Sequence, residues 1–117
     1  MNLESDHYRV RFDRERKTVV MSGTLRLQGR DEYREISNLL NESANVGNEL
    51  TIDMRGLQFL NSSGISTLSL FVIEMRKQSL ALKIVGSESI SWQAKSLYNF
   101  KRLYSAAEIQ ITRSEDA

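Results

Sequence analysis

The sequence predicts an α/β fold in which a mixed β-sheet is flanked by helices, with the element order β-β-α-β-α-β-α-β. Segments of alternating apolar residues give way to segments with an apolar residue every three or four positions, and the two kinds alternate along the chain. The length of 117 residues fits one domain over residues 1–117. We expect its core over about residues 8–112, with a polar C-terminal tail that frays.

A hairpin opens the predicted sheet. Tyr8, Val10 and Phe12 alternate with arginines, and a charged turn separates them from the β-branched run 18–21. A first helix is expected over about residues 31–44, because its start is acidic and its apolar residues recur at helical spacing.

The remaining elements continue the alternation. The run 50–54 predicts a central strand that ends near Asp53, and a second helix follows over about 63–77. Residues 80–85 predict a fourth strand. Ser87 or Ser89 is expected to cap a third helix, and Ile109 and Ile111 indicate a short last strand.

Composition excludes several functional classes. The 16 Lys and Arg against 15 Asp and Glu give a net charge of +1, which argues against a broad electrostatic grip on nucleic acid or an anionic membrane. The longest apolar run, residues 70–73, is far shorter than a membrane-spanning helix. The polar N-terminus is no signal peptide, so a cytoplasmic location is expected.

The inventory of reactive residues predicts no enzyme, no metal site and no cofactor. The sequence has no cysteine and one histidine, His7, which we expect to be solvated. It has neither the elbow of a serine hydrolase nor a glycine-rich phosphate loop. Asp53 stands where a response-regulator receiver carries its phosphorylated Asp, but the acidic pair of a receiver is missing. A structural role for Asp53, bonding the next loop, is favoured.

The segment between the central strand and the second helix carries the candidate site. Asn61 and Ser62 are good helix caps, and Gly64 would let a partner approach the backbone closely. A phosphate on Ser62 or Ser63 would lie at a helix N-terminus and add about two negative charges.

Helical geometry divides the second helix into two faces. At 100° per residue, the apolar residues of the core face fall within one stripe: Ile65, Leu68, Phe71, Val72 and Met75. Leu70 and Ile73 fall outside that stripe, on the side of Ser66 and Lys77. Exposed aliphatic groups beside polar ones often mark a partner site. The alternative is that the third helix covers them or that they simply stand exposed.

A family resemblance adds to this interpretation. The motif resembles the signature of the STAS domain family, the fold of bacterial anti-sigma-factor antagonists, in the residues Asp53, Leu57, Phe59-Leu60, Asn61-Ser62-Ser63-Gly64-Ile65 and Leu68. The predicted order of elements matches as well, over roughly residues 8–112.

The resemblance implies a phosphorylation-controlled partner switch in bacterial signal transduction and transcription regulation. A serine kinase that doubles as an anti-sigma factor would bind the unmodified domain and phosphorylate Ser63, with Ser62 as the alternate site. A PP2C-type phosphatase would restore the free form. Asp53 would shape the loop, and the partner-binding residues would be Asn61, Ser62, Gly64, Ser66, Leu70, Ile73 and Lys77.

One residue departs from the family pattern. Asn61 stands where a typical member has Asp. STAS-like regulators with a similar departure act in biofilm and cyclic-di-GMP signalling, so another output than a sigma factor is the alternative. A nucleotide-binding STAS module is a further one. The oligomeric state is left open.

Overall fold

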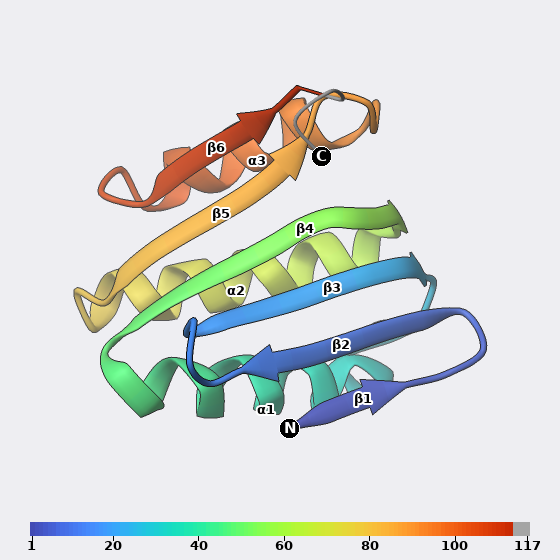
Figure 1. Cartoon of the computed structure of the whole chain (residues 1–117), viewed down its shortest axis with the longest axis horizontal. Coiled ribbons are helices and arrows are strands. Elements are labelled where there is room, and N and C mark those ends of the chain that lie inside the picture. The colour runs from blue at the N-terminus through green and yellow to red at the C-terminus, as the bar shows by residue number, and fades with distance from the viewer. Residues whose placement is uncertain (114–117) are drawn as a thin grey trace.

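The computed structural model describes residues 1–113, so the predicted fraying of the tail beyond them lies outside the described residues. One six-stranded sheet runs in the order β1-β2-β3-β4-β5-β6 (Figure 1). Its strands are β1 (Asn2–Glu4), β2 (Tyr8–Asp13), β3 (Thr18–Leu25), β4 (Glu49–Leu60), β5 (Ala81–Ser87) and β6 (Glu108–Thr112). The helices are α1 (Gly29–Gly47), α2 (Ser62–Lys77) and α3 (Gln93–Leu103).

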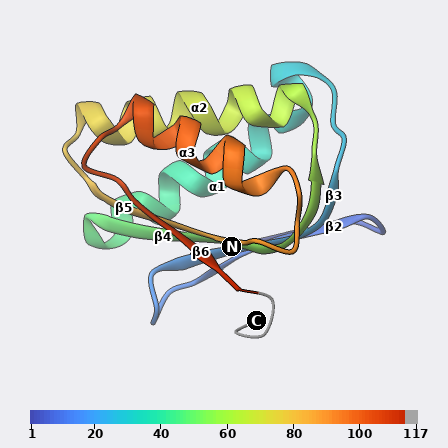
Figure 2. The same ribbon diagram turned by 90° about the horizontal axis from the view of Figure 1, so that it is seen from above.

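The sheet is mixed because its two halves are connected differently. β1, β2 and β3 pair antiparallel through tight turns, whereas β3, β4, β5 and β6 pair parallel. Each parallel connection needs a crossover, and α1, α2 and α3 supply the three. All three helices cover the same face of the sheet, and the other face is open (Figure 2).

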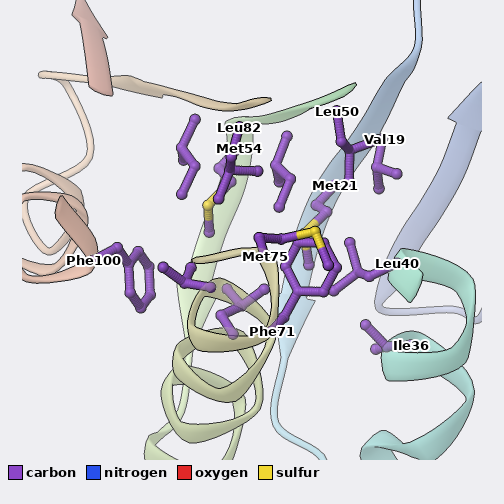
Figure 3. Close-up of a cluster of buried hydrophobic side chains, with 14 of the residues drawn as sticks. Val19, Met21, Ile36, Leu40, Leu50, Met54, Phe71, Met75, Leu82 and Phe100 are labelled. Carbon is purple, nitrogen blue, oxygen red and sulfur yellow. The ribbon is translucent and has the colours of Figure 1, made fainter. Parts of the chain in front are cut away.

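The core fills the space between the sheet and the three helices (Figure 3). Strand residues that point toward the helices, such as Val19, Ile52 and Met54, are at most 1% exposed. The predicted core stripe of α2 is buried too, except that Ile65 is only half-buried. The predicted α/β class, the hairpin and the alternation of helices with strands are therefore confirmed.

The structure differs from the prediction in one additional strand and in two boundaries. The sheet has an additional edge strand, β1, which the polar N-terminal sequence did not indicate. β4 does not end at Asp53 but continues to Leu60. The third helix begins at Gln93, and the hydroxyls of Ser87 and Ser89 bond each other at 2.8 Å instead of capping it.

Within residues 1–113, no helix combines the length and the apolar character that crossing a membrane requires.

Candidate functional site

The start of α2 is held by the side chain of Asn61, which is its N-cap. The Oδ1 atom of Asn61 accepts hydrogen bonds from the N–H of Gly64 at 3.0 Å and from the hydroxyl of Tyr33 on α1 at 2.6 Å. The first bond satisfies one of the N–H groups that a helix leaves without an internal partner. The second joins α2 to α1. Asn61 therefore fixes where the following serines lie.

The amide nitrogen of Asn61 makes a hydrogen bond that an ionised Asp at this position could not make. Its Nδ2 atom donates to the carbonyl oxygen of Leu27 at 2.7 Å, in the connection between β3 and α1. An ionised Asp has no donor for this carbonyl. The side chain at this position must accept two hydrogen bonds, from Gly64 and Tyr33, and donate one to Leu27. The amide group of asparagine does both.

Tyr33 is a dependable donor to Asn61 because it stays protonated. The side chain is only 1% exposed, and this burial raises the pKa of Tyr33 to about 12. At neutral pH its hydroxyl carries a proton and donates it to the Oδ1 of Asn61.

Gly64 packs inside the fold. It is buried, and a Cβ atom added to it would lie 2.7 Å from the Oη of Tyr33 and closer still to the side chain of Leu60. The absence of a side chain lets α2 approach α1 and the end of β4. In the structure, Gly64 and Asn61 both build the start of α2, and their predicted contact with a partner stays a prediction.

Ser63 lies at the junction between α1 and α2. Its Oγ atom accepts a hydrogen bond from the backbone N–H of Gly29 at 3.2 Å. The half-buried side chain lines an open hollow of about 300 Å³, which Arg30 also lines, while the neighbouring Ser62 is exposed. The hydroxyl of Ser63 thus faces a space with room for an added group.

The outer face of α2 presents one large apolar side chain beside these serines. Leu70 is 48% exposed and lines the same hollow as Ser63. It also lines a second hollow of about 290 Å³, which five residues of α1 and Thr67 of α2 line as well, so Leu70 lies toward α1. Ser66 and Lys77 are exposed on this face, and Ile73 is half-buried. We call Ser62, Ser63, Ser66, Leu70, Ile73 and Lys77 the α2 face.

Asp53 lies away from this face. It occupies the middle of β4 and lines a hollow of about 520 Å³ with residues of the first hairpin. Its carboxylate accepts two bonds from the guanidinium of Arg55, at 3.0 and 2.9 Å. Burial opposes the charge of Asp53, but the bonds from Arg55 outweigh it and lower the pKa of Asp53. The predicted role of Asp53 in shaping the loop before α2 is therefore wrong.

The sequence interpretation missed two residues of the site, Tyr33 and Arg30. The apolar spacing assigned Tyr33 to the core face of the first helix, which is correct, but could not show that its hydroxyl reaches Asn61. Arg30 fell just outside the predicted helix, which was expected to begin near Asp31, whereas α1 begins at Gly29. The available signal was an arginine directly before the acidic start of the predicted helix.

The arrangement of the sheet, the helices and the site can be compared with solved structures. The fold matches that of SiaC. A chain of the complex of diguanylate cyclase SiaD with its activator SiaC from Pseudomonas aeruginosa superposes with a TM-score of 0.71 at 14% sequence identity, over 96% of this chain and 99% of that chain.

Two further structures give the same result. SiaC of Pseudomonas aeruginosa has a TM-score of 0.70 at 13% identity, over 97% of both chains. Its apo form has a TM-score of 0.69 at 14% identity, over 94% of this chain and 98% of that chain. These likenesses confirm the predicted STAS-like fold class. No protein-family model matches the chain, and the comparison with curated proteins finds no match.

The comparison corrects the predicted partners. The family resemblance predicts a serine kinase of the anti-sigma type and a PP2C-type phosphatase. One chain of the solved SiaD–SiaC complex has the fold of this chain, and in that complex the protein bound to SiaC is a diguanylate cyclase. The predicted kinase and phosphatase partners are therefore wrong by this comparison.

Proposed function

We propose that this chain is a non-enzymatic regulatory module that binds a diguanylate cyclase through the α2 face and is switched by phosphorylation of Ser63. The observation that carries the proposal is the position of Leu70. It is the most exposed large apolar side chain of α2, and it lines the same hollow as Ser63. A group added to the serine therefore enters the space beside the apolar contact.

The choice of a cyclase as partner is supported by the similar complex of SiaD with its activator SiaC. It favours the predicted alternative, control of cyclic-di-GMP synthesis, over the role of an anti-sigma-factor antagonist. At 14% identity the likeness extends to the fold, so the nature of the partner belongs to the proposal.

The physics of the switch is local. Phosphorylation replaces the hydroxyl proton of Ser63 with a phosphoryl group of about two negative charges. A partner that covers Leu70 with an apolar surface would have to desolvate that charge, which costs several kcal/mol unless the charge is paired. The net charge of the chain would also change from +1 to about −1. No rearrangement of the fold is needed.

Binding to a cyclase tests the proposal. Each diguanylate cyclase encoded in the source genome is purified, and its affinity for the unmodified chain is measured by calorimetry. We expect one of them to bind and its rate of cyclic-di-GMP formation to change. If none of them binds the unmodified chain, the proposed partner class is wrong.

A second measurement addresses the predicted nucleotide-binding alternative. GTP and ATP are titrated into the chain without any protein partner. The proposal expects no saturable heat, because the contact it describes is between proteins. Saturable binding at micromolar concentration would favour a nucleotide-binding module instead.

A further inference from the structure

We propose that the hollow between the starts of α1 and α2 is an intramolecular anion site, in which the guanidinium of Arg30 pairs with the phosphoryl group on Ser63. The inference rests on the proposed function, since it takes Ser63 as the modified residue. It adds where the phosphoryl group goes and which side chain receives it.

Arg30 and Ser63 line the same hollow. The 3.2 Å bond from the N–H of Gly29 to the Oγ of Ser63 brings the first residue of α1 against the serine. Arg30 is the next residue, and it lines the same hollow of about 300 Å³ as Ser63. It also lines the adjoining hollow of about 290 Å³, so its side chain stands between the two. A phosphoryl group on Ser63 therefore enters a space that Arg30 already borders.

The charged groups in the first turn of α1 leave the guanidinium of Arg30 available to an anion. The carboxylate of Asp31 is bonded to Arg34 at 2.7 Å, and that of Glu32 accepts the N–H of Gln28 at 3.0 Å. Both acidic groups in the first turn of α1 are thus engaged, whereas Arg30 has no ion pair within residues 1–113.

The α2 side of the hollow adds no opposing charge. The first turn of α2 holds no acidic residue, and the residues it places in the hollow are Ser62, Ser63, Ser66, Thr67 and Leu70. Among the residues that line this hollow, Arg30 is the cation, and it has no ion pair within residues 1–113.

The chemistry of the pair fits. The guanidinium presents parallel N–H donors that match two phosphate oxygens, and it remains charged at every relevant pH. Pairing would draw Arg30 toward α2 and withdraw it from the surface beside Leu70. Because the guanidinium offsets about one of the two negative charges, phosphorylation would leave a net negative charge on the α2 face and would neutralise a cation that the unmodified protein presents to its partner.

The test uses the full chain with phosphoserine incorporated at position 63 during translation, so it needs neither a kinase nor a partner. The second pKa of the phosphoserine is measured by ³¹P NMR during a pH titration. A nearby guanidinium favours the dianion, so we expect this pKa to lie about one unit below that of the same chain with phosphoserine at position 91, an exposed position that does not line the hollow. Arg30→Gln is expected to abolish the difference.

Arg34→Gln is the matched control, because Arg34 is already paired with Asp31. It is expected to leave the pKa of the phosphoserine unchanged. A pKa that does not respond to Arg30→Gln, or that responds equally to both variants, overturns the inference. In that case the phosphoryl group faces solvent, and the proposed function can still be tested by cyclase binding. Arg30 is exposed, so folding of Arg30→Gln is verified by its amide NMR spectrum.

Discussion

The backbone N–H of Gly29 and the Oγ of Ser63 are joined by a hydrogen bond of 3.2 Å, although 34 positions separate the two residues in the sequence. This contact places the candidate switch at the junction of α1 and α2 and not at the free tip of a loop. The bonds of Asn61 to Tyr33 and to Leu27 hold the same junction. A change at Ser63 is therefore presented where hydrogen bonds join α2 to α1 and to the segment before it.

Leu70→Asp tests whether the α2 face binds the partner. The side chain is 48% exposed, so the free energy of unfolding should change by less than about 0.5–1 kcal/mol. Affinity for the cyclase should fall by at least about 30-fold, because an apolar anchor becomes a charge. The matched control is Tyr98→Asp on α3, which is 53% exposed outside the α2 face. Equal effects of the two variants on affinity would exclude a specific α2 face.

Asn61→Asp tests whether the amide nitrogen of Asn61 is needed at the start of α2. The carboxylate would lose the donor to the carbonyl oxygen of Leu27 and place a negative charge 2.7 Å from it. We expect a loss of about 1–3 kcal/mol in the free energy of unfolding at pH 7, measured in urea. Asn38→Asp, at an exposed position of α1, should stay within about 0.5 kcal/mol. A fully stable Asn61→Asp variant would contradict the assigned hydrogen bonds.

The raised pKa of Tyr33 predicts that the free energy of unfolding falls at alkaline pH. Its pKa is raised to about 12 by burial in the folded state, from 10.0 in the unfolded chain. Between these two values the unfolded state releases the proton and the folded state keeps it, so stability falls as pH rises from about 10 to 12. The two units correspond to about 2–3 kcal/mol.

Comparison of the wild type with Tyr33→Phe isolates this effect from the titration of lysines. The difference in unfolding free energy between the two proteins should change with pH only above about pH 10. A difference that stays constant up to pH 12 would show that the hydroxyl of Tyr33 is not buried.

Gln93 closes a gap in the sheet, where β4 continues beyond its pairing with β5. Its Nε2 atom donates to the carbonyl oxygens of Met54 and Leu57 at 2.6 and 2.9 Å, and its Oε1 atom accepts the N–H of Ser87 at 2.8 Å. Gln93→Leu should cost about 3 kcal/mol or more, because three buried backbone groups lose their partner. Thermal unfolding measures it against the exposed control Gln58→Leu, and similar melting temperatures would refute the role.

Sequence periodicity predicted those elements whose burial follows a single repeat. The α2 helix is the clearest case, since Leu68, Phe71, Val72 and Met75 are buried as the 100° spacing required. β1 has only three residues, of which Leu3 alone packs against the core, so it shows no alternation to detect.

The end of β4 was missed for a different reason. The pairing of β3 with β4 shifts register between Val20 and Ser22, opposite Asp53 and Gly56, so the alternation of the strand is interrupted there. The sequence after Gly56 therefore lacks the alternation of a strand, and these residues were predicted to form a loop.

The site was predicted in part. The sequence pattern located Ser63 and the exposed Leu70, because both follow from the position of one helix. The contacts of Asn61 with Tyr33 and Leu27 link segments about 30 residues apart, and no local spacing encodes them. For the same reason the sequence could not place Arg30 beside Ser63.

The central claim is that Ser63 switches a protein contact on the α2 face. Its most direct measurement is the affinity of the cognate diguanylate cyclase for the unmodified chain and for the chain with phosphoserine at position 63. We predict at least a 30-fold weaker complex for the modified chain, with full affinity kept in Ser63→Ala. Equal affinity of the unmodified and the modified chain would contradict the account.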